Sequence, residues 1–201
     1  NNPTWEKNMA DDIVSRRYLS GEYADKNPDW DSGDAPWKAA LVADILLRNK
    51  IRPQTLVEVG CGAGGVLAAL RSSYPGTQLS GYDIAPGAAG FWARHETARI
   101  HFEVGDFLEI NHGVQDVVLL LDVLEHLGDP FSFLERLRPH SRYAVFHIPL
   151  DLSAISVLRE SPLLHVRERV GHIHYYTRKL ALAMLEECGY EIIEARYTGA
   201  A

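Results

Sequence analysis

The sequence is short of cysteine, of net positive charge and of long apolar runs. Two cysteines, Cys61 and Cys188, occur among 201 residues, and neither lies in the spacing of a zinc site. Two cysteines make no disulfide framework, which favours a reducing, cytoplasmic setting. The formal net charge of −7 argues against binding to DNA, and no run approaches the roughly 20 apolar residues of a membrane span. The composition, 46% hydrophobic, is that of a globular domain.

The order of apolar runs predicts one α/β domain preceded by helices. We expect residues 1–50 to form an N-terminal helical cap. Residues 1–5 show no signal-peptide pattern. After residue 53, strands and helices alternate, which predicts a doubly wound, mostly parallel sheet in a domain over residues 51–201. The predicted strands are 55–59, 78–84, 100–107, 116–123, 143–150 and 191–197. The predicted helices are 11–19, 37–49, 64–72, 86–96, 130–137 and 177–188.

Glycines follow the first predicted strand, where residues 58–65 read Glu-Val-Gly-Cys-Gly-Ala-Gly-Gly. Glycine allows a sharp turn and the close approach of a ligand to the backbone. Gly60, Gly62 and Gly65 satisfy the G-x-G-x-x-G pattern of dinucleotide-binding loops, so a nicotinamide cofactor is one interpretation. The acid at Glu58 argues against it, because a carboxylate beside a pyrophosphate is repelled.

The series Glu-x-Gly-x-Gly-x-Gly resembles the first motif of the class I S-adenosylmethionine-dependent methyltransferases. Further motifs follow at later strand ends, and the resemblance spans roughly residues 56–197. The similarity is to small-molecule enzymes, including those of ubiquinone- and menaquinone-pathway type. It implies a Rossmann-like fold, S-adenosyl-L-methionine as the cofactor, and a loop that faces the amino-acid end of that cofactor. The loop residues are Glu58, Gly60, Cys61, Gly62 and Gly64.

Acids end the second and third predicted strands. Asp83 follows the glycine loop by about 20 residues, the offset of an acid that accepts hydrogen bonds from a ribose diol. The resemblance implies the same role, with Ile84 against adenine. It also implies that Asp106, in Gly105-Asp106-Phe107, accepts a hydrogen bond from the adenine amino group, with Phe107 nearby. The alternatives are a helix cap at Asp83 and an ordinary turn at Asp106.

The fourth predicted strand ends in Leu121, Asp122 and Val123, followed by Glu125 and His126. A similar Leu-Glu-His turn is found in many small-molecule members of the family. The resemblance implies that the first three residues flank the methionine portion of the cofactor. Glu125 and His126 are then expected at the mouth of the site, where His126 either moves a proton or shapes the loop.

Three histidines are candidate catalytic residues, in the order His172, His126 and His147. A hydroxyl acceptor needs a general base, most often histidine, whereas a neutral amine does not. Each histidine is therefore alternatively structural. His172 and His174 on an extended segment share one face and suit a metal pair, but no third ligand is evident, so no metal site is predicted.

Residues 151–176 interrupt the strand–helix rhythm, and the resemblance implies that they form an insertion on the acceptor side. Arg159, Arg167 and Arg169 within it indicate an anionic acceptor or, alternatively, a solvated helix face. The fourth strand lacks the Asn/Asp-Pro-Pro motif of base-amino methylation. We therefore expect methyl transfer to an O or N atom of a small molecule. The alternatives are an NAD(P)-dependent oxidoreductase and a non-catalytic module that binds S-adenosylmethionine.

Overall fold

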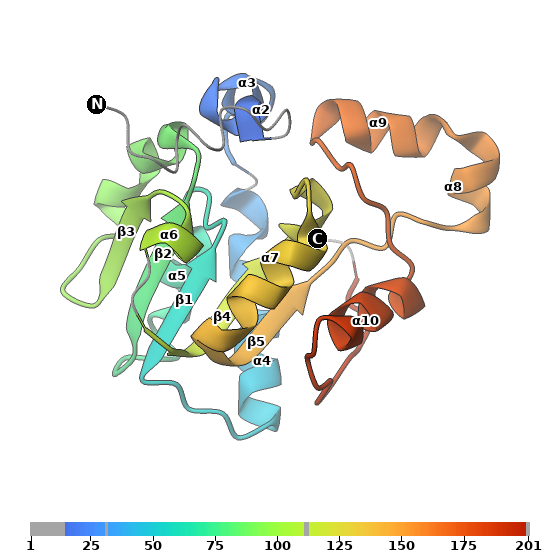
Figure 1. Cartoon of the computed structure of the whole chain (residues 1–201). Coiled ribbons are helices and arrows are strands. Elements are labelled where there is room, and N and C mark those ends of the chain that lie inside the picture. The colour runs from blue at the N-terminus through green and yellow to red at the C-terminus, as the bar shows by residue number, and fades with distance from the viewer. Residues whose placement is uncertain (1–14, 31, 111–112, 200–201) are drawn as a thin grey trace.

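The computed structural model describes residues 15–30, 32–110 and 113–199. At its centre lies a five-stranded sheet in the order β3-β2-β1-β4-β5 (Figure 1). Every neighbouring pair in the sheet is parallel, which confirms the predicted doubly wound architecture. The strands are β1 (Thr55–Val59), β2 (Gln78–Asp83), β3 (Ile100–Val104), β4 (Gln115–Leu121) and β5 (Ser141–His147). The strand order reverses between β1 and β4, where ligands of such sheets bind.

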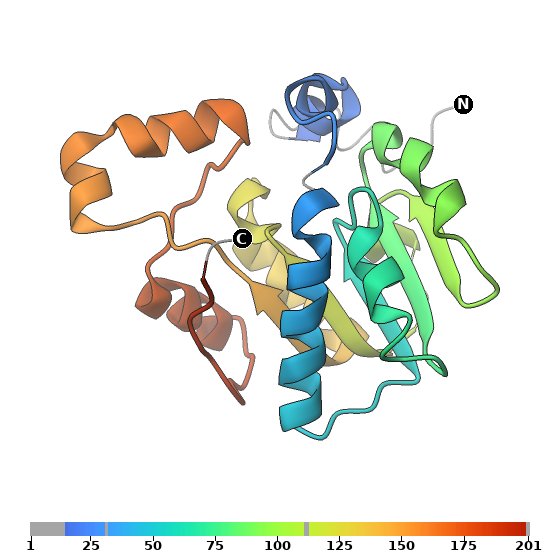
Figure 2. The same cartoon turned by 180° about the vertical axis from the view of Figure 1, so that it is seen from behind.

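Helices cover both faces of the sheet, because successive side chains of each strand point to opposite faces. Along β4, Val117 and Leu119 pack in one buried cluster, whereas Val118 and Leu120 pack in the other. The first cluster includes α4 (Ala35–Arg48), α5 (Gly65–Leu70) and the 3-10 helix η2 (Pro86–Arg94), and Figure 2 shows α4 and α5 on this face. The second includes α7 (Pro130–Leu137) and α10 (Arg178–Glu187).

Shorter helices surround the carboxyl ends of the strands. Helices α2 (Ser15–Leu19) and α3 (Glu22–Lys26) lie above the strand tips, and α8 (Ala154–Arg159) and α9 (Ser161–Arg169) lie beside them (Figure 1). The remaining elements are α6 (Phe107–Ile110), η1 (Ser32–Asp34), η3 (Leu124–His126) and η4 (Arg138–His140). None of the described helices is long and apolar enough to cross a membrane.

The predicted strand at 191–197 is wrong. This segment forms no strand, and the sheet described here ends at β5. The segment is instead tied to α4: Glu194 Oε1 lies 3.0 Å from Arg48 Nε, and Arg196 Nη1 lies 2.5 Å from Asp44 Oδ2. A strand needs a neighbour that accepts its backbone hydrogen bonds, and these ion pairs hold the segment against a helix.

Other boundaries differ for local reasons. The strand predicted at 100–107 stops at Val104, because the Asp106 carboxylate accepts a hydrogen bond from Leu108 N–H at 2.9 Å as α6 begins. The helix predicted at 86–96 is the 3-10 helix η2, and helices α3, α8 and α9 were not predicted. The predicted helix at 11–19 includes α2, while its first residues lie outside the described part of the chain.

Candidate functional site

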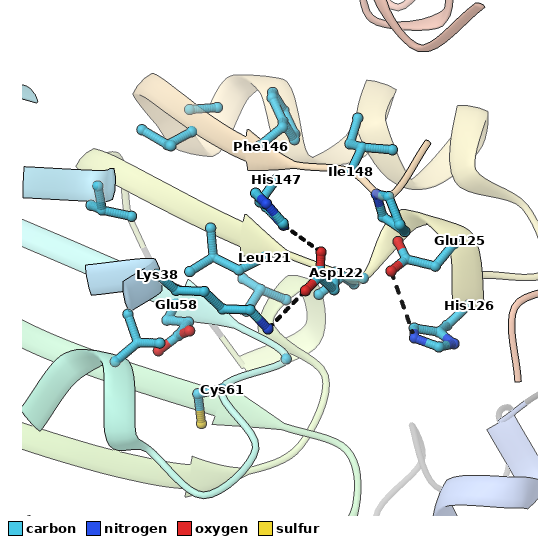
Figure 3. Close-up of a pocket in the computed structure, with 18 of the residues that line it drawn as sticks. Lys38, Glu58, Cys61, Leu121, Asp122, Glu125, His126, Phe146, His147 and Ile148 are labelled. Atoms are coloured by element: carbon cyan, nitrogen blue, oxygen red, sulfur yellow. Dashed lines mark hydrogen bonds and ion pairs between the residues drawn. The ribbon is translucent and has the colours of Figure 1, made fainter. Parts of the chain in front are cut away.

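A cleft of about 1610 Å³ runs along the carboxyl ends of β1, β2 and β4 and continues beside the outer edge of β5. Every residue predicted to bind cofactor lines it, with the exception of Gly64, and so do the three candidate histidines. Figure 3 shows side chains from α4, β1, β4 and β5 pointing into it. The tertiary structure therefore gathers motifs as far apart in the sequence as Glu58 and His172.

The glycine loop has a backbone that other residues rarely adopt. Gly60, Gly62 and Gly64 have φ angles of 73°, 49° and 76°. A Cβ on Gly60 lies 2.7 Å from Val123 Cγ2, and a Cβ on Gly64 lies 2.6 Å from the Phe102 ring. Gly64 thus packs against the sheet beneath the loop, whereas Gly62 has no atom closer than 3.7 Å to such a Cβ. The loop leaves bare backbone facing the cleft at Gly62.

Asp83 holds this loop from the neighbouring strand. Its Oδ2 accepts a hydrogen bond from Gly62 N–H at 2.8 Å, and its Oδ1 accepts one from Ala85 N–H at 2.9 Å. Burial raises the pKa of Asp83, and these two N–H donors oppose that rise. Trp92 Nε1 donates to the Gly62 carbonyl at 2.8 Å from the other side. Sequence spacing predicted the position of Asp83 but not these bonds, which depend on where the loop turns.

Glu58 is the most isolated acid of the loop. It is 3% exposed, and its Oε2 has no hydrogen-bond partner among the described residues. Burial raises its pKa to about 8, although the Lys38 ammonium lowers it. Lys38 comes from the first turns of α4, and no sequence motif marked it as a site residue. A cationic group beside Glu58 favours the ionised carboxylate and lowers this pKa.

Asp122 and His147 form a pair deeper in the cleft (Figure 3). Asp122 Oδ1 lies 2.5 Å from His147 Nδ1, and its Oδ2 lies 2.7 Å from Lys38 Nζ. Burial raises the pKa of Asp122, but the His147 hydrogen bond and the lysine charge outweigh it and bring the pKa below its usual value. His147 Nε2 lies 3.1 Å from Thr198 Oγ1. Both ring nitrogens of His147 are therefore occupied by protein partners.

The residues predicted for the adenine side lie where β2 and β3 end. Ile84 and Asp106 line the cleft, and burial raises the pKa of Asp106. Phe107 is almost fully buried and packs against Tyr82, with ring centroids 5.2 Å apart. Cys61 is also buried, and burial raises the pKa of its thiol well above the usual value. Phe107 and Cys61 thus contribute more to the walls than to polar contact.

Glu125, His126 and His172 converge at the mouth of the cleft. Glu125 Oε1 lies 3.8 Å from His126 Nε2 and 3.9 Å from His172 Nε2. His172 Nδ1 lies 2.7 Å from Asp151 Oδ2, and His126 Nδ1 lies 3.2 Å from the Gly171 carbonyl. Burial raises the pKa of Glu125 well above its usual value, whereas burial and the His172 ring lower the pKa of His126 to about 4. Asp151 was missed because nothing in its sequence context pairs it with His172.

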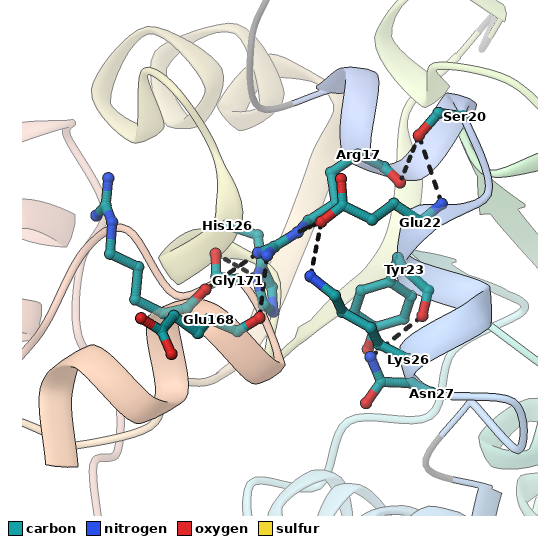
Figure 4. Close-up of polar contacts among 10 residues, drawn as sticks. Arg17, Ser20, Glu22, Tyr23, Lys26, Asn27, His126, Glu168 and Gly171 are labelled. Atoms are coloured by element: carbon teal, nitrogen blue, oxygen red, sulfur yellow. Dashed lines mark hydrogen bonds and ion pairs between the residues drawn. The ribbon is translucent and has the colours of Figure 1, made fainter. Parts of the chain in front are cut away.

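Backbone bonds and an arginine hold this arrangement in place. The Glu125 carbonyl accepts hydrogen bonds from the N–H groups of Ile173 and His174, at 2.9 and 3.1 Å. Arg17 of α2 donates to the carbonyls of Arg167 and Glu168 at the end of α9, each at 3.1 Å (Figure 4). Helix α2 and the insertion therefore meet above His126.

The arginines of the insertion and a tyrosine of α2 differ in their position relative to the cleft. Arg159, Arg167 and Arg169 are exposed and do not line the cleft, so their side chains fit the alternative of a solvated helix face. Tyr18 of α2, which was not predicted, contacts His126 edge-on with ring centroids 6.0 Å apart. Its hydroxyl is buried and has no partner among the described residues.

Comparison with known proteins gives one family. Residues 35–195 match the family model described as a methyltransferase domain. Malonyl-[acyl-carrier protein] O-methyltransferase of Hahella chejuensis is 31% identical over 105 residues, covering 49% of this chain and 38% of that protein. Norajmaline N-methyltransferase of Rauvolfia serpentina is 28% identical over 109 residues, covering 50% of this chain and 36% of that protein. The matched regions therefore span less than half of these curated relatives.

Solved structures share the fold. Human N-acetylserotonin methyltransferase in complex with SAM has a TM-score of 0.67 at 20% identity, over 95% of this chain and 57% of that one. A putative methyltransferase of Haloferax volcanii, solved with the activator Trm112, has a TM-score of 0.66 at 21% identity, over 89% of this chain and 77% of that one. These likenesses are to methyltransferases that share the Rossmann-like architecture.

Proposed function

This chain belongs to the methyltransferase domain family, and we propose that it binds S-adenosylmethionine and transfers the methyl group to an O or N atom of a small molecule. One observation carries the proposal. The glycine loop, bare at Gly62 and held by Asp83, lies next to the buried carboxylate of Glu58. This combination suits a ligand with a sugar and a cationic amino-acid tail.

The cofactor is assigned along the cleft by the chemistry of each wall. Glu58 and the loop backbone take the methionine ammonium and carboxylate. Asp83 takes the ribose hydroxyls, since each of its oxygens accepts one bond from the protein and has capacity for another. Asp106 and Ile84 take adenine, and Leu121 and Val123 flank the methionine chain.

The acceptor side lies at Glu125, His126 and His172. The sulfonium methyl is already electrophilic, so the main task of the protein is to hold an acceptor atom in line behind it and to exclude water. Asp151 orients the His172 ring through Nδ1 and leaves Nε2 facing the cluster, the arrangement of a base held by a carboxylate. We propose His147 as a positioning residue, because both of its nitrogens hold Asp122 and Thr198.

The oxidoreductase alternative requires a pyrophosphate over the glycine loop. Glu58 and Asp83 both lie beside that loop, and the ionised form of either carboxyl opposes an anionic ligand. The non-catalytic alternative keeps the cofactor contacts and makes no use of the His172–Asp151 pair. The oxidoreductase alternative predicts a different ligand. The non-catalytic alternative predicts the same ligand without turnover.

Calorimetry with S-adenosylhomocysteine and with NADH tests the ligand. We expect micromolar binding of S-adenosylhomocysteine and none of NADH; the reverse result contradicts the proposal. Turnover is tested with methyl-labelled S-adenosylmethionine and a panel of hydroxyl, carboxyl and amine acceptors. His172→Ala is expected to lower the rate by about 10²–10⁴ with cofactor affinity unchanged. An unchanged rate removes His172 from the acceptor side.

A further inference from the structure

The Glu125 side chain is in an unusual position for an acid. It is fully buried, and neither of its oxygens has a hydrogen-bond partner among the described residues. Two ring nitrogens, His126 Nε2 and His172 Nε2, lie at 3.8 and 3.9 Å from Oε1, beyond hydrogen-bond distance. One atom of each of the three side chains lies within 4.8 Å of the other two. A buried carboxylate without a partner is strongly unfavourable, so this position needs a physical cause.

The other nitrogen of each ring identifies the atoms that face Glu125. His126 Nδ1 donates to the Gly171 carbonyl, and His172 Nδ1 donates to Asp151 Oδ2. A carbonyl and a carboxylate only accept, so in each neutral ring the proton lies on Nδ1 and Nε2 carries a lone pair. Two lone pairs and a carboxylate then face one another across the same small space. They repel unless a proton or a cation lies between them, and the separations of 3.8 and 3.9 Å are too long for a shared proton.

We infer that Glu125, His126 and His172 bind one divalent transition-metal ion. Two imidazoles and one carboxylate are a ligand set that zinc takes in catalytic sites. The Nδ1 bonds to a carbonyl and a carboxylate are the usual outer partners of metal-bound histidines. With bonds of about 2.1 Å, the ligand atoms of a tetrahedral site lie about 3.4 Å apart, so small side-chain rotations close the present distances. Imidazole favours zinc, iron or nickel over magnesium.

No metal site was expected from the sequence, because His172 was paired with His174 and no third ligand was evident. In the structure His174 is not a member of the cluster, and the other two ligands come from η3. The Ile173 and His174 N–H groups bond to the Glu125 carbonyl and bring the segment with His172 to that turn. The set is therefore created by tertiary contact and has no spacing signature in the sequence.

The role of the ion rests on the proposed function. Three protein ligands leave a coordination position open, and Glu125, His126 and His172 line the cleft. In the metal-loaded chain His172 Nε2 is a ligand in place of a base, and an acceptor hydroxyl bound to the ion loses its proton to solvent at lower pH than a free one. Its oxygen lone pair then forms the bond to the sulfonium methyl carbon, and the electrons of the carbon–sulfur bond remain on sulfur. The site would therefore take acceptors that present oxygen rather than nitrogen.

Metal content is the first test. Protein stripped with a chelator, loaded with ZnCl2 and dialysed is expected to retain about one zinc ion per chain. Loading with CoCl2 is expected to give visible ligand-field absorption. Zinc at about one hundred times its Kd should raise Tm by roughly 5–10 °C. Retention below about a tenth of an ion per chain contradicts the inference, because a three-ligand site holds its ion through dialysis.

Variants locate the ion. Glu125→Gln keeps the size of the side chain, and its amide can donate to an imidazole lone pair, so the metal-free variant should be at least as stable as the wild type. Zinc affinity is expected to fall at least about a hundredfold in Glu125→Gln and in His172→Gln. His101→Gln, on β3 with a side chain 60% exposed, is the matched control and should retain zinc. Wild-type zinc affinity in Glu125→Gln overturns the assignment.

Two measurements separate this inference from the proposed function. S-adenosylhomocysteine that binds the metal-free chain supports the proposed function whatever the zinc result. A chain that holds zinc but not S-adenosylhomocysteine retains the metal site and contradicts the proposed function. Acetohydroxamate, a small oxygen ligand, is expected to change the cobalt spectrum of the loaded protein. Unchanged bands mean a closed coordination sphere and overturn the acceptor-binding role.

Discussion

The two sides of the cleft differ in how their buried polar groups are satisfied. On the side of β1 and β2, Asp83 and Trp92 are both bonded to the backbone of the glycine loop. On the side of η3, the Glu125 carboxylate and the hydroxyls of Tyr18 and Tyr176 are buried with no hydrogen-bond partner among the described residues. Glu58 Oε2 is the exception on the first side.

This difference indicates that the β1–β2 side of the cleft is preformed, whereas the η3 side contains buried polar groups that a ligand could satisfy. The glycine loop is held by bonds within one β–loop–β unit, so it has its binding shape before a ligand arrives, which lowers the entropy lost on binding. The η3 side is assembled from α2, η3 and the segment after α9, and its buried groups lack partners of their own. A substitution on one side of the cleft therefore leaves the other side as an internal reference.

Gly64→Ala gives the largest expected effect and breaks the preformed side. The φ angle of 76° and a Cβ position 2.6 Å from Phe102 both oppose a side chain. We expect the free energy of unfolding to fall by about 2–5 kcal/mol, measured by chemical denaturation. Gly90→Ala is the control, since its Cβ meets nothing within 4 Å, and should change stability by less than about 0.5 kcal/mol. Equal losses in the two variants would show that the loop does not depend on glycine here.

Glu58 should make the preformed side sensitive to pH. Burial raises its pKa in the folded protein from 4.5 to about 8, so between these values the folded state holds a proton that the unfolded state has lost. The contribution of this proton to the free energy of unfolding is full below pH 4.5 and is lost as pH rises through 8. From about pH 5.5 to about pH 8, the wild type should lose about 3 kcal/mol relative to Glu58→Gln in denaturant titrations. If the free energies of unfolding of the wild type and of Glu58→Gln change with pH in parallel, Glu58 does not titrate in this range.

Asp83→Ala should lower S-adenosylhomocysteine affinity by roughly ten- to a hundredfold in calorimetry, because two backbone N–H groups and the sugar lose an acceptor. Asp116→Ala is the matched control. Asp116 Oδ2 also accepts two backbone N–H groups, from Gln54 and Thr55, at the opposite end of the sheet. Both variants should lose stability, and only the first should lose affinity. Loss of affinity in both variants would mean that binding depends on the stability of the whole sheet and not on Asp83 in particular.

Arg17→Ala gives the smallest expected effect and loosens the η3 side alone. Its two bonds to the end of α9 are partly exposed, so we expect a local loss of about 1 kcal/mol, seen as faster amide hydrogen exchange in α9 and around Gly171. The exposed Arg16 on the same helix is the control, as Arg16→Ala. Faster exchange in the glycine loop as well would show that the two sides are coupled.

The strands and the cleft-lining positions that were predicted correctly are those for which sequence-local signals suffice. Apolar runs predicted the five strands, because a strand buried on both faces is mostly apolar, as β4 is from Val117 to Leu121. The position of Asp83 followed from its offset to the glycine loop. The strand at 191–197 was predicted from the same kind of pattern and was wrong, because pattern alone does not show whether β5 or α4 will be its neighbour.

By itself, the sequence determined the strand–helix alternation, the turn at the glycines and the family, since each depends on residues close together in the chain. Only the tertiary structure decided which polar groups meet. Lys38 reaches Asp122 from α4, and His172 reaches Glu125 from beyond α9. Such encounters depend on how loops pack over the sheet, and loop packing leaves no periodic signal in the residues themselves.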